Sequence, residues 1–138
     1  MITIDYTGDY EPIRGSKFAA AYDLKATATV EIRPGELKDI STGICAQPPL
    51  GYAGLLFIRS GMSKRGLRLS TGVSVIDPDY TGEIICCVRN DSEDVLIVRE
   101  GDRIAQIMYV PFMEVHWNRV DKLKKTERGD GGFGSTGK

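Results

Sequence analysis

Short apolar segments, most of them followed by glycine, proline, aspartate or asparagine, recur along this chain. In residues 27–33 (TATVEIR) polar and apolar side chains alternate, and Pro34 and Gly35 follow at the place of a turn. Alternation with a period of two residues is typical of a half-buried β-strand, and patterning with the helical period is nearly absent. The sequence therefore predicts an all-β domain, either a sandwich or a barrel.

The same pattern places the individual elements. Besides residues 27–33, the predicted strands are residues 2–5, 18–26, 37–45, 53–58, 67–75, 83–88, 95–98 and 103–112. A single turn of helix is predicted at residues 61–65, with Ser60 capping its first amides. The chain has 138 residues, which suits one compact domain, and we place this domain at residues 1–119. Residues 120–138 are rich in glycine and poor in apolar side chains, which predicts a mobile tail that orders on binding.

Charge and composition exclude several partners. The formal net charge is −1, so no strongly basic surface is expected for a long nucleic acid. No apolar run approaches the roughly 18 residues that cross a bilayer, and the first residues lack the features of a signal peptide. Cys45, Cys86 and Cys87 are odd in number and do not suggest a disulfide framework. We expect a cytoplasmic protein with no membrane partner.

The glycine-rich tail carries a motif of its own. Residues 132–138 (GFGSTGK) match the core of a phosphate-binding P-loop, but no strand precedes them and no helix pattern follows, so we reject that interpretation. A glycine-rich backbone can still converge its amides on phosphate, with Arg128, Ser135 and Thr136 adding donors. For the tail alone, a solvated chain end is the simpler interpretation, although Phe133 could stack on a nucleobase.

Two other segments combine turn chemistry with charged groups. Residues 77–83 (DPDYTGE) lie between two apolar stretches and predict a hairpin turn, in which Asp77 bonds to the turn backbone. A carboxylate on a rigid turn could also orient a water molecule. At residues 59–61, an arginine, a serine and free amides meet where the helix begins, which favours an anion, although a plain serine cap is commoner. Sequence spacing leaves both pairs of interpretations open.

Taken together and in order, five segments are similar to the five motifs of the trimeric dUTP diphosphatases (dUTPases). They are AAAYDL (19–24), RSGMSK (59–64), VIDPDY (75–80), GDRIAQ (101–106) and RGDGGFGST (128–136). The resemblance covers nearly the whole chain. It implies a distorted β-barrel or jelly roll of the dUTPase-like β-clip type, which assembles as a homotrimer with shared active sites. It also implies hydrolysis of dUTP to dUMP and pyrophosphate with Mg²⁺ as cofactor.

The resemblance assigns roles to single residues. Asp77 resembles the carboxylate that activates the water attacking the α-phosphorus, and Tyr80 resembles the tyrosine that leaves no room for a ribose 2′-hydroxyl. Asp23 resembles an outer-sphere carboxylate that reaches the metal through water. The other implied contacts are Arg59, Ser60, Gly61 and Gln106 for phosphates, Thr71, Val75, Ile76 and Ile85 for uracil, and Arg128, Phe133, Gly134, Ser135 and Thr136 in the tail that closes over the nucleotide.

The chain departs from the family pattern at three positions, and two other functions remain open. Ser74 and Ala21 stand where glycine is usual, and Thr81 stands where arginine is common. A positive φ at residue 74 would strain a serine there. The alternatives are a dCTP deaminase-like enzyme that uses Glu83, and a catalytically idle homologue that senses a nucleotide or binds a protein. The segments 75–80 and 128–136 favour the diphosphatase.

Overall fold

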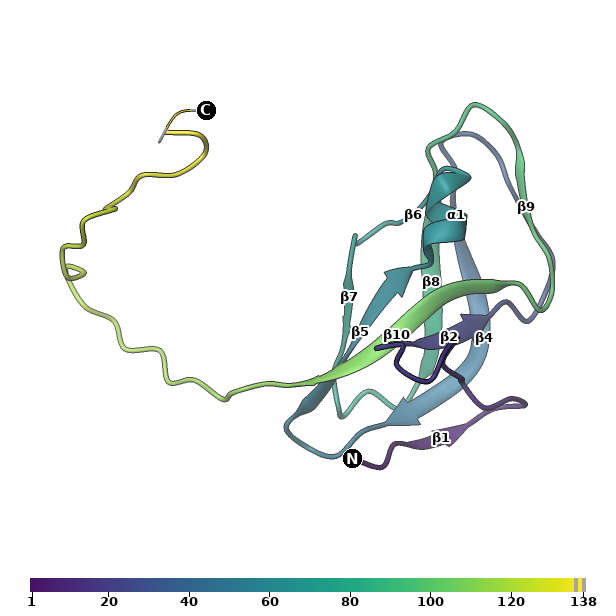
Figure 1. Cartoon of the computed structure of the whole chain (residues 1–138), viewed down its shortest axis with the longest axis horizontal. Helices are drawn as coiled ribbons and strands as arrows, with labels where there is room; N and C mark the ends of the chain where they lie inside the picture. Colours follow the sequence, from purple (N-terminus) through teal and green to yellow (C-terminus); the bar gives the residue numbers. More distant parts are fainter. Residues whose placement is uncertain (136, 138) are drawn as a thin grey trace.

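The computed structural model describes residues 1–135 and 137. Within them the chain forms two four-stranded antiparallel sheets and a two-stranded ribbon, with one short helix (Figure 1). The elements are β1 (Asp5–Thr7), β2 (Tyr22–Lys25), β3 (Val30–Ile32), β4 (Leu37–Gln47), β5 (Tyr52–Ile58), α1 (Ser60–Lys64), β6 (Leu67–Leu69), β7 (Ser74–Ile76), β8 (Glu83–Asn90), β9 (Leu96–Val98) and β10 (Arg103–Pro111). The all-β prediction is confirmed.

The sheets join segments that are distant in sequence. One sheet has the strand order β1-β4-β8-β6, the other has the order β2-β10-β5-β7, and β3 pairs with β9. Strand β10 is central because it pairs with β2 along one edge and with β5 along the other. Four of the five segments singled out by the resemblance therefore have residues in this sheet or at its edge, namely residues 19–24, 59–64, 75–80 and 101–106.

Several predicted bounds were wrong, each for a local reason. The first strand lies at Asp5–Thr7 rather than at residues 2–5, because it pairs with the far end of β4. The segment 18–26 becomes a strand only at Tyr22, since residues 16–19 form a turn and the Phe18 side chain is 88% exposed. Residues 67–75 divide into β6 and β7 at Gly72, whose φ of +74° permits the turn.

The helix also begins one residue earlier than predicted. Ser60 is its first residue and Arg59 holds the cap position, where no side chain caps the free amides. The predicted serine cap was therefore wrong. Because Ser60 is the first helical residue instead, its exposed side chain is not used in capping the helix and stands next to Arg59.

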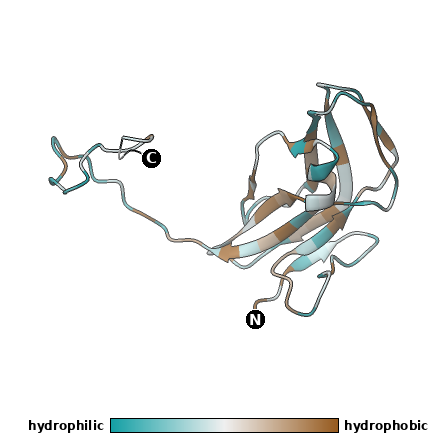
Figure 2. Cartoon of the chain, turned by 45° about the horizontal axis from the view of Figure 1, so that its top comes forward, coloured by the Kyte–Doolittle hydropathy of each residue, from teal (hydrophilic) through white to brown (hydrophobic). Residues whose placement is uncertain are grey.

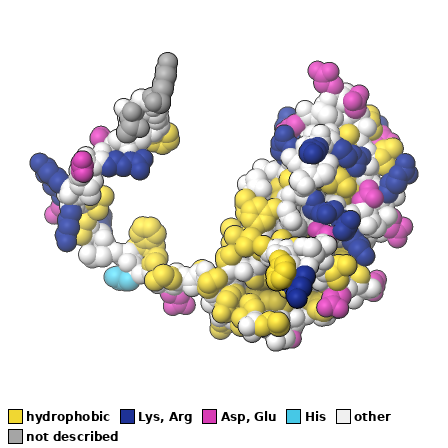
Figure 3. Space-filling view, in the orientation of Figure 1, with side chains coloured by type: hydrophobic (Ala, Val, Ile, Leu, Met, Phe, Trp, Pro, Cys, Tyr) yellow, Lys and Arg dark blue, Asp and Glu magenta, His cyan; other side chains and the backbone are white. Residues whose placement is uncertain are grey.

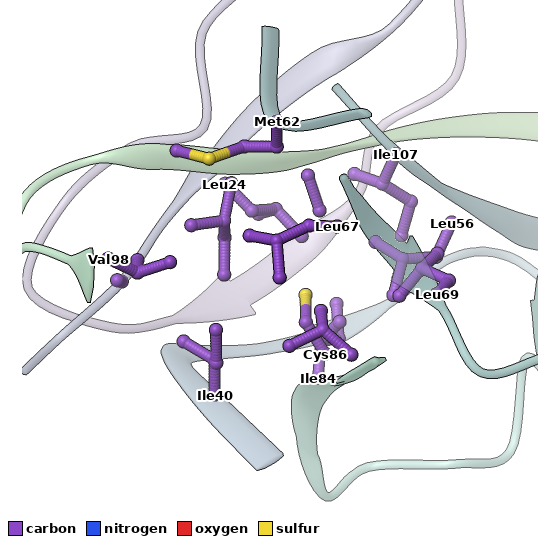
Figure 4. Close-up of a cluster of buried hydrophobic side chains, with 14 of the residues drawn as sticks. Leu24, Ile40, Leu56, Met62, Leu67, Leu69, Ile84, Cys86, Val98 and Ile107 are labelled. Atoms are coloured by element: carbon purple, nitrogen blue, oxygen red, sulfur yellow. The ribbon is translucent and has the colours of Figure 1, made fainter. Parts of the chain in front are cut away.

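The core lies between the two sheets and is built by strand alternation. In β8, Ile84, Cys86 and Val88 are almost completely buried, while the alternating Ile85 and Cys87 lie on the other face. Figure 4 shows Ile84 and Cys86 within the buried cluster. Burial raises the pKa of the Cys86 thiol to about 12, so this thiol stays protonated at neutral pH. Figure 2 shows the apolar residues concentrated on the strands and the polar residues on the connections.

After β10 the chain leaves the barrel. The amide of Phe112 still donates to the carbonyl of Gly51 (2.9 Å), but among the described residues no later hydrogen bond joins this segment to the barrel. We call residues 112–135 the C-terminal arm; it contains no strand or helix and extends away from the body of the molecule (Figures 1 and 3). Several of its apolar side chains are open to solvent, with Trp117 89% exposed. Within the described residues no helix is long and apolar enough to cross a membrane.

Candidate functional site

A buried carboxylate with two arginines occupies the outer face of the second sheet. Asp23 in β2 lies opposite Gln106 in β10, and its side chain is only 6% exposed. Its Oδ1 forms an ion pair with Nε of Arg59 at 2.9 Å, and its Oδ2 accepts a hydrogen bond from Nη1 of Arg103 at 3.2 Å. The backbone of β10 also holds Arg59, whose amide donates to the carbonyl of Ile104 (3.1 Å).

These contacts leave polar groups open to solvent at one edge of the barrel. No hydrogen bond among the described residues uses the terminal nitrogens of Arg59, and the Ser60 side chain and Gly61 are exposed. A guanidinium fork of this kind suits bidentate contact with phosphate oxygens. The structure thus brings together Asp23, Arg59, Ser60, Gly61 and Gln106, and we call this set the arginine cluster.

A second group of predicted residues lies around the turn between β7 and β8. The amide of Tyr80 donates to the carbonyl of Asp77 (3.1 Å), which closes a turn, and the Tyr80 hydroxyl donates to the carbonyl of Glu83 (2.7 Å). The prediction of a hairpin was wrong, because β7 pairs with β5 whereas β8 pairs with β4 and β6 in the other sheet. The Asp77 side chain is exposed and makes no hydrogen bond or ion pair within the described residues. It is free to bind a water molecule.

The other predicted residues of this second group are largely exposed to solvent. Val75 is 63% exposed and Ile85 is 38% exposed, while Ile76 is half-buried. Thr71 and Ser74 share a hydrogen bond between their hydroxyl groups (2.6 Å). Residue 74 does not have a positive φ, so the serine there carries no strain of the kind considered from the sequence.

The two groups lie far apart within one chain. Strand β7 pairs with β5 so that Ser74 faces Leu56 and Ile76 faces Gly54. Asp77 follows Ile76, near Ala53, whereas Arg59 follows the other end of β5. At about 3.3 Å per residue, this places roughly 20 Å between the two positions. One chain therefore does not bring Asp77 and the arginine cluster into a single site.

The arm residues form a third group. The Arg128 Nε donates to the carbonyl of Gly131 (2.7 Å), and Phe133 is fully exposed with a φ of +52°. Gly134 and Ser135 follow it on the exposed arm, and Thr136 lies outside the described residues. Among the described residues of this group, no hydrogen bond or ion pair joins a side chain to the barrel of the same chain.

Glu83, the residue of the deaminase alternative, has its carboxylate already engaged. Strand β4 bulges at Thr42–Ile44, where Gly43 has a φ of +67°, and this bulge turns the Gly43 amide toward Glu83. One Glu83 oxygen accepts from the Ser41 hydroxyl and from the Gly43 amide (2.7 Å). The Ser41 hydroxyl, followed by the Gly43 amide, lowers the pKa of Glu83. Glu83 is thus an ionised structural carboxylate.

This arrangement predicts a pH-dependent effect of Glu83→Gln. Because the folded-state pKa of Glu83 lies below its ordinary value, the charged form stabilises the fold above that ordinary value, and this stabilisation is lost as the pH falls through the folded-state pKa. At pH 7 the variant is expected to melt about 2–4 °C lower than the wild type, and the difference should shrink in acid. Thermal unfolding followed by circular dichroism between pH 3 and 8 measures this, with Glu93→Gln as the control. A difference that stays constant with pH would contradict it.

Sequence reasoning assigned no role to two residues of these groups, Arg103 and Ser41. Arg103 stands within GDRIAQ but carried no signal that it contacts Asp23, which lies 80 positions earlier in the chain. Ser41 is half-buried in a strand and meets Glu83 only through the pairing of β4 with β8. Both contacts depend on strand pairings that local sequence patterns do not specify.

A cavity lined mostly by apolar side chains lies elsewhere. It has a volume of about 410 Å³ and lies beneath the N-terminal segment, between residues such as Ile4, Tyr22, Ile44 and Ile107. None of the predicted site residues lines it. Among the described residues, no three His, Cys, Asp or Glu side chains are grouped closely enough to hold a metal ion.

Comparison with known proteins agrees with the order of the motifs. Residues 11–137 match the family model for dUTPase. The chain is 45% identical over 123 residues to the deoxyuridine 5′-triphosphate nucleotidohydrolase of Desulfitobacterium hafniense, covering 86% of this chain and 82% of the relative. It superimposes with a TM-score of 0.88 on a point mutant of the dUTPase of Staphylococcus bacteriophage 80alpha with dUpNHpp, at 27% identity and 98% coverage of both chains.

A further match links the fold to a structure that contains a metal. A point mutant of the dUTPase from phage phi11 of S. aureus, solved with a structural Mg(II) ion, gives a TM-score of 0.78 at 25% identity, covering 89% of this chain and 99% of that one. The family model covers most of the sequence, and the match to the relative from Desulfitobacterium hafniense covers most of that protein's length. The chain therefore belongs to the dUTPase family of nucleotidohydrolases.

Proposed function

We propose that this protein hydrolyses dUTP to dUMP and pyrophosphate, with Asp77 as the general base. The observation that carries the proposal is the state of Asp77 in a member of this family: an exposed carboxylate on a hydrogen-bonded turn, without a protein partner among the described residues. Such a group can accept a proton from a positioned water molecule.

In the proposed reaction, a water molecule gives a proton to Asp77 and its oxygen bonds to the α-phosphorus. The bond between this phosphorus and the oxygen bridging to the β-phosphorus breaks, and pyrophosphate leaves without a covalent intermediate. Arg59, Ser60 and Gln106 would hold the phosphates by charge and hydrogen bonds, and Gly61 leaves open space beside them. Arg128, Gly134, Ser135 and Thr136 would add contacts from the arm.

The metal in this proposal is Mg²⁺, bound mainly by the substrate. Both oxygens of Asp23 are paired with arginines, and the described residues offer no cage of carboxylates. This donor set fits an outer-sphere role for Asp23, through water, because Mg²⁺ keeps much of its hydration shell in proteins. When bound, the ion would neutralise phosphate charge.

We also propose that the active form is a homotrimer with shared sites. The separation of roughly 20 Å between Asp77 and Arg59 along β5 and β7 supports this, since one chain cannot present both to the same phosphate. The arm supports it as well, because its residues extend away from their own barrel and would reach a neighbour. Each site would then combine the arginine cluster, the turn between β7 and β8, and the C-terminal arm, each from a different subunit.

The residues around the turn between β7 and β8 would select the nucleotide. Thr71, Val75, Ile76 and Ile85 would surround the uracil, and a cytosine would leave buried polar groups unpaired, at a cost of about 1–3 kcal/mol each. Phe133 would stack on the base from the arm. Tyr80 would pack beneath the deoxyribose, and its hydroxyl is held by the carbonyl of Glu83.

Gly82→Ala is expected to weaken discrimination between dUTP and UTP. A Cβ at residue 82 would lie 2.7 Å from the Tyr80 hydroxyl oxygen and 2.8 Å from Cζ, so the exposed Tyr80 ring would have to move. We expect the ratio of kcat/KM for dUTP over UTP to fall about tenfold, with little change in melting temperature. Steady-state assays with both nucleotides measure this, and Gly15→Ala is the control, because Gly15 has no positive φ and an added Cβ would meet no atom closer than 4.0 Å. If the ratio of kcat/KM for dUTP over UTP stayed at the wild-type value, Tyr80 would not be the residue that excludes the 2′-hydroxyl.

The test of the proposed function is product identification. The purified protein is incubated with Mg²⁺ and each of dUTP, dCTP, dTTP, dATP, dGTP and UTP, and the products are separated by anion exchange. We expect dUMP and pyrophosphate from dUTP alone. Ammonia with an intact triphosphate from dCTP would establish a deaminase, and binding of dUTP without turnover would establish an idle homologue.

A further inference from the structure

Asp23 is shared by two arginines that come from the ends of two neighbouring strands of its sheet, β5 and β10. Arg59 follows β5 and contacts Oδ1, while Arg103 begins β10 and contacts Oδ2. The carboxylate is 6% exposed, whereas the side chains of Arg59 and Arg103 are 31% and 48% exposed. The negative charge is therefore buried, and both positive groups reach the solvent.

The charges explain why one arginine would not be enough. A buried Asp23 paired with Arg59 alone would cancel the charge of that guanidinium and present a neutral pair to an approaching anion. With Arg103 present, the three groups carry a net charge of +1 at neutral pH. Screening by water is weaker near the buried carboxylate than in bulk solvent, so this difference acts strongly at close range.

The contact geometry of Asp23 and Arg59 is also consistent with a guanidinium that remains available to an anion. The ion pair between Asp23 and Arg59 is formed through Nε at 2.9 Å, and no hydrogen bond among the described residues uses the terminal nitrogens of Arg59. Carboxylates readily take two parallel hydrogen bonds from one guanidinium when both of their oxygens are available. Because Arg103 occupies Oδ2, Asp23 can hold the plane of Arg59 through one oxygen without capturing a second donor.

We propose that Arg103 is a positioning residue that balances Asp23 and thereby keeps the Arg59 guanidinium available for a phosphate of the substrate. This inference rests on the proposed function and adds to it a residue that would not itself touch the nucleotide. Removal of Arg103 would let Asp23 pair fully with Arg59, and phosphate binding would weaken although Arg59 remains.

The test is equilibrium binding of dUpNHpp, measured by calorimetry in EDTA so that a metal plays no part. Arg103→Met is expected to bind about tenfold more weakly than the wild type. Arg99→Met is the matched control, because Arg99 is exposed in the turn before β10 and its side chain has no hydrogen bond or ion pair within the described residues. It should stay within about twofold. Melting temperatures confirm that each variant is folded.

A double-mutant cycle with Asp23→Asn tests the route of the effect. An uncharged asparagine at residue 23 cannot form an ion pair with Arg59. Adding Arg103→Met to this variant should therefore change the affinity for dUpNHpp by less than about twofold. The same tenfold loss in both backgrounds would mean that Arg103 contacts the nucleotide directly, and would overturn the inference. An unchanged affinity of Arg103→Met in the wild-type background would also overturn it.

Arg103→Lys keeps the proposal testable if the methionine variant does not fold. Lysine restores the charge beside Asp23, so we expect an affinity within about threefold of the wild type. A folded Arg103→Lys protein that binds tenfold more weakly would contradict the charge balance. Failure of the wild type itself to bind dUpNHpp would instead contradict the proposed function, so the two failures can be told apart.

Discussion

Asp77→Asn is expected to lower kcat for dUTP at least about a hundredfold, while the affinity for dUpNHpp stays close to that of the wild type. Asparagine has the size and shape of aspartate but cannot accept the proton of the attacking water. Asp77 also contributes little to folding, because its side chain is exposed and makes no contact with a described polar group. Steady-state kinetics and calorimetric titration separate the two effects.

Asp79→Asn is the matched control. Asp79 is a second exposed aspartate on the same turn, two residues away, and it has no place in the proposed reaction. It should retain kcat within about twofold. If Asp77→Asn turned over dUTP at the wild-type rate, or if both variants lost activity equally, Asp77 would not be the base.

Removal of residues 128–138 is expected to leave a folded protein of unchanged oligomeric state whose kcat/KM is about a hundredfold lower or worse. No hydrogen bond among the described residues joins this part of the arm to the barrel, so its loss should not change the melting temperature appreciably. Activity would suffer because the donors and the Phe133 ring that close over the nucleotide are gone, and misplaced substrate loses much of its rate. Size-exclusion chromatography with light scattering, together with kinetics, gives both readouts.

A variant that removes positive charge but keeps the motif separates closure over the nucleotide from simple electrostatic attraction. Residues 119–138 carry six basic and three acidic side chains, a net charge of +3. Replacing Lys124 and Lys125 with glutamine removes two positive charges from the arm but leaves its motif intact. We expect this variant to keep kcat/KM within about threefold at physiological salt. Full activity of the truncated protein would show that the arm is only a solvated chain end.

Local patterning predicted the strands well where one face is buried and the other is exposed. In β4 and β8 the alternation of buried and exposed side chains is nearly continuous, and both strands lie where they were predicted, with an extra residue or two at the end. Prediction was poorer where pairing partners set the bounds. Residues 2–5 look like a strand by composition, but β1 follows the register of Cys45–Gln47 and begins at Asp5.

The positions of the candidate site residues could be predicted only in part. Each of Asp77, Tyr80 and Arg59 lies at the turn or strand end that its local sequence predicts. The contact of Asp23 with Arg103 and the hold of Ser41 on Glu83 were not predictable, because they join residues 80 and 42 positions apart. Such contacts are set by which strands pair and in which register.

The sequence by itself determined the all-β class, the turns and the identity of the reactive groups, because these follow from the preferences of a few neighbouring residues. Only the tertiary structure decided that Arg103 shares the buried Asp23 with Arg59, and that Asp77 lies at the far end of β5 from Arg59. The physical reason is that strand pairing joins distant segments through backbone hydrogen bonds that are nearly the same for every sequence. The choice among pairings is made by the packing of the whole core.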